Sequence, residues 1–448
     1  MRERIVLFAI IFGLGVFLYV FQNYFNTLWG LVFLCCAMLV YAFYMHLATL
    51  HKRRQLRKNP QVINENFKPF VTIMIPSHNE EGVISKTVEN VLAITYEKFE
   101  VIVIDDRSDD NTASVIKDLE KKYDKVTAMV RPKDAYPGKS AVLNEAMALA
   151  KGEAILVFDA DARVQPDFLS RLVPHLESED VGAVQARKVI SNKDYNFLTR
   201  CQNNEYTLDT HFQVGRDAVK GAVELRGNGE LIKRAALEDI GGWNNYTITD
   251  DLDMSTQLHI KGWDVRFCSD TVVYEEGVVY LIPLFRQRRR WLEGSIRRYL
   301  EHFGDVLNSK EMSLRASLDM TAYISEFLMP IWLLMEIFFQ VGRVATGVKP
   351  INYAFSSLTM GLAIAVCFVL AIRYSLRRYD NVPRSKALKQ AIETALYMLV
   401  IWFPVVMWIC FKILFCKKDM NWGKTTHGLV LEEEQHLKAQ ELVCQVNK

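Results

Sequence analysis

Long apolar segments lie at both ends of the chain, with a mixed polar and apolar sequence between them. Ile5–Phe21 is almost continuously apolar behind Arg2 and Arg4, and Leu28–Leu50 follows after a short polar stretch. Each segment is long enough to cross the hydrocarbon core of a bilayer as a helix. Residues 1–50 are therefore predicted to form a transmembrane hairpin. The alternative for the first segment is a secretory signal, but no Ala-x-Ala cleavage pattern follows it.

A basic run follows the second apolar segment directly. Residues 51–58 read His-Lys-Arg-Arg-Gln-Leu-Arg-Lys, and cations beside a membrane helix mark its cytoplasmic end. Residues 51–69, which include Pro60 and Pro69, are predicted to be a basic linker. The domain that follows is then expected to be cytoplasmic, on a multi-pass protein of the cell (inner) membrane.

From Phe70 the pattern changes to short apolar strands that alternate with helices. Strands are predicted at Val71–Ile75, Glu100–Ile104, Val126–Val130, Ile155–Phe158, Val181–Ala186, Val265–Phe267 and Val272–Tyr274, and helices at Ile84–Leu92, Asn111–Lys122, Ser140–Ala150, Asn203–Gly215 and Asp250–Ile260. This order predicts an α/β fold with a doubly wound sheet, parallel in its first half. No Gly-x-Gly-x-x-Gly follows the first strand, which argues against a dehydrogenase-type dinucleotide fold.

The C-terminal third combines an amphipathic helix with three apolar segments. One helical face carries Leu292, Ile296, Tyr299, Leu300, Phe303 and Leu307. Residues 292–326 are predicted to lie on the membrane surface, the alternative being a helix packed on the protein core. Residues 327–416 contain Phe327–Val341, Tyr353–Ile372 and Ala391–Phe415, and residues 417–448 form a tail. The side of the membrane on which this tail lies stays open, because Arg373–Lys389 looks cytoplasmic and one more crossing would place Lys417 outside. The segment Phe327–Val341 carries Glu336 and is the one expected not to cross if the tail is cytoplasmic.

Composition narrows the function classes. The chain has 54 Lys and Arg against 52 Asp and Glu, a net charge of +2, which gives no argument for a nucleic-acid partner. Its eight cysteines include no Cys-x-x-Cys pair, so neither a disulfide framework nor a zinc site is expected. The mixed middle, residues 70–291, is long enough for one large domain.

The apolar run Ile155–Phe158 stops at two carboxylates, Asp159 and Asp161. Both can face one side of an extended chain, and the carboxyl end of a strand is where open α/β sheets bind ligands. Two hard oxygen ligands beside a diphosphate suit Mg²⁺ or Mn²⁺. The alternative is a solvated Asp-x-Asp pair, which is common.

Other groups of reactive side chains follow a recognisable order. They are Asp105-Asp106 at a strand end, Thr249-Asp250-Asp251 at a helix start, and Gln287-x-x-Arg290-Trp291 before the return to the membrane. With Asp159 and Asp161, they resemble the membrane-bound glycosyltransferases of family 2, which include cellulose, chitin, hyaluronan and poly-N-acetylglucosamine synthases. The resemblance runs from about Phe70 to Arg298. It implies a nucleotide-sugar-binding, GT-A-like mixed sheet, a UDP-sugar donor and a divalent metal.

The resemblance also gives roles to single residues of the donor site. Asp161 would hold the metal, with Asp159 near the ribose or as a second ligand. Asp105 or Asp106 can accept the imide N–H of uracil. The remaining donor-pocket candidates are Glu80 and Lys139. Lys139 would reach a phosphate, the alternative being a solvated loop lysine.

Asp251 is the predicted general base, because an acceptor hydroxyl becomes a good nucleophile only as its proton is taken. The family commonly has Thr-Glu-Asp here, and this chain has Asp250 in place of the Glu. The alternative is a helix N-cap. Arg290 can clamp the diphosphate, and Trp291 offers a flat floor for a sugar. The alternative for the Gln287–Trp291 segment is a basic membrane-surface patch.

The acceptor is narrowed by a closer resemblance, to the cyanobacterial-type monoglucosyldiacylglycerol synthases. It is carried by Val181–Gln185, Glu224–Gly229, Gly241–Asn244, Thr247–Asp253 and Glu275–Val278, and Arg288-Arg289 departs from it. It implies inverting transfer of glucose from UDP-glucose to 1,2-diacylglycerol of the lipid bilayer. Two alternatives stay open: a processive polysaccharide synthase acting on a growing glycan, which needs a tunnel, and an inactive sugar-nucleotide-binding membrane protein. A lipid acceptor instead needs a lateral opening.

Overall fold

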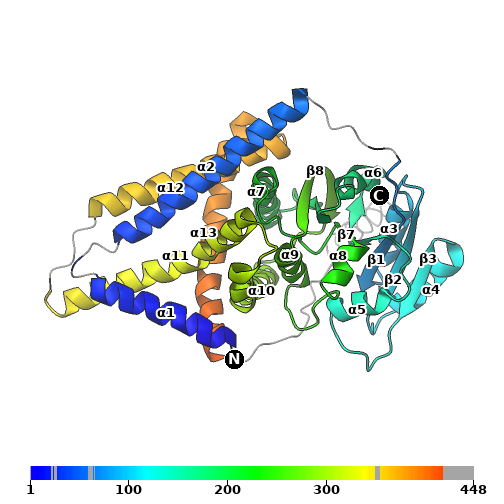
Figure 1. Cartoon of the computed structure of the whole chain (residues 1–448), viewed down its shortest axis with the longest axis horizontal. Coiled ribbons are helices and arrows are strands. Elements are labelled where there is room, and N and C mark those ends of the chain that lie inside the picture. Colours follow the sequence, from blue (N-terminus) through cyan, green and yellow to red (C-terminus); the bar gives the residue numbers. More distant parts are fainter. Residues whose placement is uncertain are drawn as a thin grey trace, which may run out of the picture.

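In the described part of the chain, one eight-stranded sheet organises the middle of the sequence. The structure, a computed structural model, describes residues 2–21, 24, 28–58, 64, 66–348 and 354–416; the predicted tail lies outside them. The strands are β1 Val71–Ser77, β2 Phe99–Asp105, β3 Val126–Val130, β4 Ala154–Val157, β5 Arg163–Val164, β6 Val181–Ile190, β7 Glu230–Lys233 and β8 Asp264–Glu275. Figure 1 shows the sheet at one end of the molecule and long helices at the other.

The sheet has the order β3-β2-β1-β4-β7-β6-β8-β5. β1 pairs in parallel with both β2 and β4, and β2 with β3. β7 runs antiparallel to β4 and to β6, and β6 is parallel to β8. The predicted α/β class with a mixed sheet is confirmed. The chain changes direction across the sheet between β1 and β4, which is the switch point where open sheets bind ligands.

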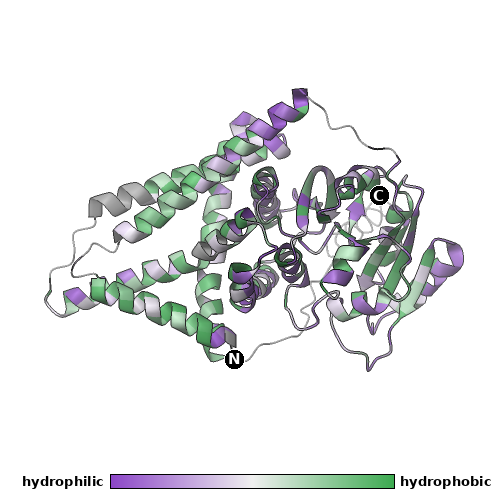
Figure 2. Cartoon of the chain, in the orientation of Figure 1, coloured by the Kyte–Doolittle hydropathy of each residue, from purple (hydrophilic) through white to green (hydrophobic). Residues whose placement is uncertain are grey.

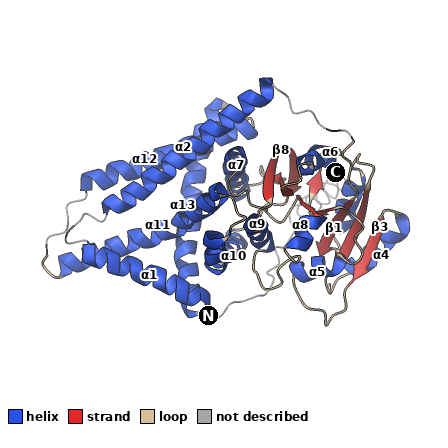
Figure 3. Ribbon diagram, viewed as in Figure 1, coloured by secondary structure: helices blue, strands red, loops and turns tan. Residues whose placement is uncertain are grey.

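Helices cover both faces of this sheet (Figure 3). One face packs on α3 (Ile84–Leu92), α4 (Thr112–Lys122) and α6 (Phe168–Leu172), and the other on α5 (Lys139–Ala146), α8 (Arg234–Asp239) and α9 (Asp250–Ile260). Along β1, Ile73 and Ile75 enter the first core and Met74 enters the second. Burial on both faces explains why the strands are continuous apolar runs in the sequence.

Within the residues that the structure describes, seven longer helices form the other half of the molecule or join it to the sheet. They are α1 (Arg2–Phe21), α2 (Leu28–Lys58), α7 (Phe197–Val219), α10 (Leu281–Asn308), α11 (Leu314–Ala345), α12 (Ala354–Tyr379) and α13 (Arg384–Phe415). Among the described residues, four helices are long and apolar enough to cross a membrane: Glu3–Phe21, Trp29–Lys58, Leu314–Ala345 and Arg384–Phe415. Figure 2 shows that apolar residues dominate α1, α2, α11 and α13.

The helix α13 contacts the α/β half at both ends. Asp380, just before it, binds Arg187 on β6, and Lys412 near its end binds Glu293 on α10 at 2.6 Å. Figure 1 shows it running across α11 and α12. Both of its ends therefore contact elements of the α/β half, although its length and composition would allow it to cross a membrane. The sequence analysis left open whether Phe327–Val341, within α11, crosses the membrane or the tail lies outside.

Several element boundaries differ from the predicted ones. α3, β3 and α9 begin and end close to their predicted positions, but α2 continues through the basic run to Lys58. The two short strands predicted near Val265 and Val272 are one strand, β8, with a register shift opposite Ala186 and Arg187. The predicted domain boundary at residue 291 falls inside α10, which spans Leu281–Asn308.

Helix α10 is packed on protein rather than standing alone at a surface. Leu292, Ile296 and Leu300 are buried in a cluster with α11 and α13. Arg297 and Arg298 are also buried, because Arg297 binds Glu293 and Arg298 binds Glu224. This environment agrees with the core-packed alternative for this stretch.

Candidate active site

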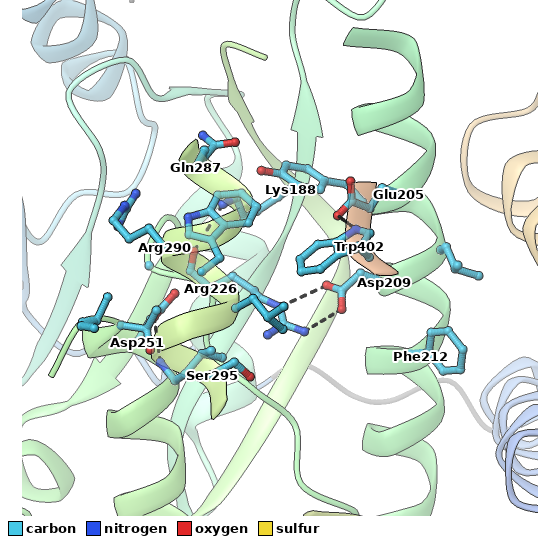
Figure 4. Close-up of a pocket in the computed structure, with 18 of the residues that line it drawn as sticks. Lys188, Glu205, Asp209, Phe212, Arg226, Asp251, Gln287, Arg290, Ser295 and Trp402 are labelled. Carbon is cyan, nitrogen blue, oxygen red and sulfur yellow. Dashed lines mark hydrogen bonds and ion pairs between the residues drawn. The ribbon is translucent and has the colours of Figure 1, made fainter. Parts of the chain in front are cut away.

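A cavity of about 1080 Å³ opens at the carboxyl ends of β1 and β4 and extends toward the long helices. All the predicted site residues except Asp105 and Asp106 line it: Glu80, Lys139, Asp159, Asp161, Asp251, Gln287, Arg290 and Trp291. Figure 4 shows Gln287, Arg290 and Asp251 on one side of it. Side chains that are far apart in the sequence therefore share one space.

Lys139, the first residue of α5, is the cation among these acids. Its Nζ donates to Asp159 Oδ1 and to the carbonyl of Gly227, both at 2.7 Å. Burial alone would lower the pKa of Lys139, but the charges of Asp159, Asp250 and Glu230 outweigh it and raise the pKa. Lys139 is thus not a solvated loop lysine; it ties the end of β4 to the loop that carries Gly227.

Asp251 lies in the first turn of α9, against that loop. Gly227 has a φ of +75°, and a Cβ there would stand 3.1 Å from Asp251 Oδ2, so glycine permits the close approach. Burial, followed by the charge of Asp250, raises the pKa of Asp251 to about 6. The preceding Thr249 is the N-cap residue, but its side chain makes no cap hydrogen bond within the described structure.

Glu230 is a buried acid that the sequence analysis missed. It begins β7, and its Oε2 accepts the N–H of Gly227 at 3.2 Å, while Oε1 has no partner among the described residues. Burial raises the pKa of Glu230 to about 8, with Lys139 opposing the rise and Asp251 adding to it. Its carboxyl supports the Gly227 turn beneath Asp251. The run Glu-Leu-Ile-Lys carries no alternation that would have marked it as a strand.

Gln287, Arg290 and Trp291 lie on one face of α10, as the i, i+3 and i+4 spacing requires. The Trp291 ring stacks on Tyr206 of α7, with centroids 6.4 Å apart at 27°. Burial lowers the pKa of Arg290, although the nearby charges of Asp251, Asp250 and Asp159 oppose this. Arg290 therefore faces the acids of the cavity.

Arg288, one of the two residues that depart from the resemblance, is fully buried. Its guanidinium binds Glu205 of α7 at 3.0 Å and lies 4.3 Å from the centroid of the Trp291 ring. Arg288 thus fixes Trp291 from behind instead of forming part of an exposed basic patch.

Asp159 and Asp161 end the central strand β4 with different partners. Asp159 binds Lys139, whereas Asp161 Oδ2 accepts the backbone N–H of Glu276 at 2.9 Å. Within the described residues, no three His, Cys, Asp or Glu side chains are grouped to hold a metal ion. Mg²⁺, however, is commonly held by one or two carboxylates with substrate phosphates and water. These carboxylates fit an ion that arrives with a diphosphate.

Asp105 and Asp106 are buried at the end of β2, outside the lining of the cavity. The carboxylate of Asp106 is held by Arg107 and Arg131. Asp105 Oδ2 accepts from Ser108 N at 3.4 Å, and its Oδ1 has no partner among the described residues. Of the two acids, Asp105 therefore keeps an oxygen without a partner among the described residues, although that oxygen is buried outside the cavity lining.

A mixed sheet with an Asp-x-Asp pair at its switch point, facing a second acid on a helix, defines a glycosyltransferase with a GT-A-like fold. The chain belongs to the glycosyltransferase-like family 2, whose profile matches residues 69–294. It is therefore a sugar-transferring enzyme.

Comparison with named proteins gives the following similarities. The chain is 38% identical over 364 residues to the β-monoglucosyldiacylglycerol synthase of Trichormus variabilis, covering 80% of this chain and 76% of the relative. It is 34% identical over 383 residues to the Synechocystis sp. protein of the same name, covering 83% and 77%. Among solved structures, it resembles the mannosyltransferase PcManGT from Pyrobaculum calidifontis, in complex with GDP-Man and Mn²⁺, with a TM-score of 0.55 at 22% identity over 82% of this chain and 99% of that one. The last similarity concerns the fold alone.

Proposed function

We propose that this enzyme transfers glucose from UDP-glucose to 1,2-diacylglycerol, with inversion, at the cytoplasmic face of the cell (inner) membrane. The observation that carries the proposal is the cavity itself, because it joins the acids at β4 and α9 to apolar side chains of the long helices. The relatives that match about four-fifths of the chain are named β-monoglucosyldiacylglycerol synthases, which supports the same sugar and acceptor.

The transfer follows from the chemistry of the residues around the cavity. Asp251 takes the proton of the lipid hydroxyl as its oxygen attacks the anomeric carbon. The bond from that carbon to the diphosphate breaks on the opposite face, and UDP leaves. Lys139 and Arg290 stabilise the negative charge of the diphosphate. Attack opposite the leaving group inverts the anomeric centre.

The donor is oriented by groups on both sides of the transferred sugar. Trp291 forms an apolar floor for the sugar ring, with Gln287 one turn away and Glu80 across the pocket. Asp105 accepts the imide N–H of uracil, whereas Asp106 keeps its partners Arg107 and Arg131.

A divalent ion, Mg²⁺ or Mn²⁺, neutralises the leaving diphosphate when it is bound. Asp161 is the protein ligand that suits it best. Asp159 would be a second ligand only if its contact with Lys139 loosened, since that contact spans 2.7 Å. In this proposal, oxygen atoms of the donor's diphosphate would be the other ligands of the ion.

A processive polysaccharide synthase is the second candidate, and the lining of the cavity argues against it. A sugar polymer needs polar and aromatic groups along its path. Aromatic side chains such as Tyr41, Phe368 and Trp402 do line the long-helix part of the cavity, but most of its lining is aliphatic. An inactive protein is disfavoured because every predicted acid is retained.

The test is to supply membranes that contain the protein with radiolabelled UDP-glucose and diacylglycerol. The expected result is one chloroform-soluble glycolipid. A labelled polymer, whether soluble in water or insoluble, would instead identify a polysaccharide synthase.

A further inference from the structure

The part of the cavity that faces the long helices is an apolar chamber. We define it by Met38 and Met45 of α2, Phe327 of α11, Ala365 and Phe368 of α12, and Leu399 of α13. The four helices enclose it as a ring, because α2 and α13 each pack on both α11 and α12. These walls belong to the apolar half of the molecule (Figure 2).

The exposed residues on the chamber wall are apolar as well. Gly361 and Ala365 of α12 line the chamber and are exposed. Leu396 and Leu399 of α13 also line it, with 58% and 60% of their surfaces exposed. Exposed apolar surface of this kind marks a site for an apolar ligand or a membrane. It lies where α12 and α13 pack together.

A polar neck separates the apolar chamber from Asp251. Arg226 donates to both oxygens of Asp209, at 2.6 and 3.2 Å, and to Glu224 at 3.0 Å. Figure 4 shows Arg226 between Asp251 and Asp209, with Phe212 beyond Asp209. Asp209 pairs with Arg226 through both of its oxygens, and Glu224 is shared with Arg216 and Arg298. Because Arg226 is thus already paired, the neck suits an uncharged hydroxyl better than an anionic headgroup.

We propose that the apolar chamber binds the acyl chains of a neutral lipid acceptor, which enters sideways between α12 and α13. The lipid passes its hydroxyl through the neck to Asp251 while its chains stay against α2, α12 and α13. This inference rests on the proposed function, since it concerns the acceptor of that same reaction. It adds where the lipid binds, by which route it arrives, and why its headgroup carries no charge.

The test fills the apolar chamber and compares acceptors of different length. Ala365→Trp places an indole in the chamber, and Ala363→Trp, two residues earlier, is the matched control. Ala363 is also exposed on α12 but does not line the cavity, because two residues turn a helix by about 200°. Each variant is assayed with dioleoylglycerol in vesicles and with dihexanoylglycerol. Its affinity for UDP-glucose is measured in a separate binding experiment.

Ala365→Trp is expected to lower kcat/KM for dioleoylglycerol by at least about tenfold, because several buried methylenes lose their site. Activity on dihexanoylglycerol should fall less, and UDP-glucose affinity should stay at the wild-type value. Ala363→Trp should match the wild type in all three measurements. Equal activity of the two variants on dioleoylglycerol would overturn the inference.

A second measurement does not depend on transfer or on the variant's folding. A diacylglycerol that carries a diazirine in one acyl chain is photolysed with wild-type protein, and the labelled peptides are mapped. Labels on Phe368 and Leu399 are expected, and labels confined to other helices would contradict the chamber. If the wild type glucosylates no diacylglycerol of any length, the proposed function fails, and the labelling alone then decides whether the chamber binds lipid.

Discussion

Lys139 and Asp159 form an ion pair of 2.7 Å at the carboxyl end of the central strand. The same ammonium group also donates to the carbonyl of Gly227, the glycine that lies against Asp251. One cation therefore links the proposed donor side of the cavity to the proposed base. The protonation and position of Asp251 should respond to changes at its charged neighbours.

Replacing Asp251 with asparagine should remove the group that accepts the proton of the acceptor hydroxyl. We expect Asp251→Asn to lower kcat by about 10²–10⁴-fold, while UDP binding stays close to the wild-type value. Radiolabelled transfer and calorimetric UDP binding measure the two quantities. Near-normal turnover would rule out Asp251 as the base.

The pH profile should show the titration of Asp251. Its pKa is raised to about 6 by burial and then by Asp250. Below that pH the carboxyl is protonated and cannot accept a proton, so kcat/KM should fall as the pH drops through about 6. A profile that stays flat down to pH 5 would be incompatible with this role.

The acid limb of this profile is the fall of kcat/KM at low pH. Two substitutions should shift it in opposite directions. Asp250→Asn removes a negative charge that raises the pKa of Asp251, so the limb should shift to lower pH. Lys139→Met removes a positive charge that lowers the same pKa, so the limb should shift to higher pH. Profiles of kcat/KM against pH for both variants test the signs. Shifts in the same direction would mean that another group controls the limb.

Asp161→Ala should abolish the dependence of donor binding on metal. We expect the apparent affinity for UDP-glucose in the presence of Mg²⁺ to fall by at least about tenfold. Asp118→Ala is the control, because that acid lies on α4 with its side chain 70% exposed and paired to Lys121. If Asp161→Ala binds the donor equally well with and without Mg²⁺, and as tightly as the wild type does with it, Asp161 is not the ligand.

The arrangement of α13 predicts which side of the membrane its end occupies. Cys416 lies beside Arg4 at the start of α1, on the side that carries the sheet. In a chain whose other cysteines are replaced, an impermeant maleimide should label Cys416 only after the cells are permeabilised. A cysteine at Tyr24, which is 81% exposed between α1 and α2, should react in intact cells. Labelling of Cys416 in intact cells would require α13 to cross.

Much of the α/β fold could be predicted because its strands are buried on both faces. Continuous apolar runs such as Ile155–Phe158 predict strands well, and the acids at strand ends marked the edge of the sheet where the cavity lies. The antiparallel strand β7 was missed because it has only four residues, Glu230–Lys233, and begins with an acid. The pKa of that acid is set by burial and by Lys139 and Asp251, which lie far away in the sequence.

The burial of charged residues on α10 could not be predicted from the helical pattern either. Arg297 and Arg298 are polar by type, yet both are buried, because Glu293 and Glu224 pair with them. Glu224 also accepts from Arg216 and Arg226, so one carboxylate joins three distant segments. Periodicity cannot reveal such pairs, since it describes one helix at a time.

Helix α13 forms part of the wall of the apolar chamber and also contacts Glu205, which supports Trp291 through Arg288. Trp402 lines the cavity and donates its indole N–H to Glu205, which in turn binds Arg288 behind the Trp291 ring. A lipid that shifts Trp402 would therefore alter the surface on which the sugar rests. Thermodynamic linkage requires the effect to be mutual: if lipid strengthens sugar-nucleotide binding, sugar nucleotide must strengthen lipid binding by the same factor.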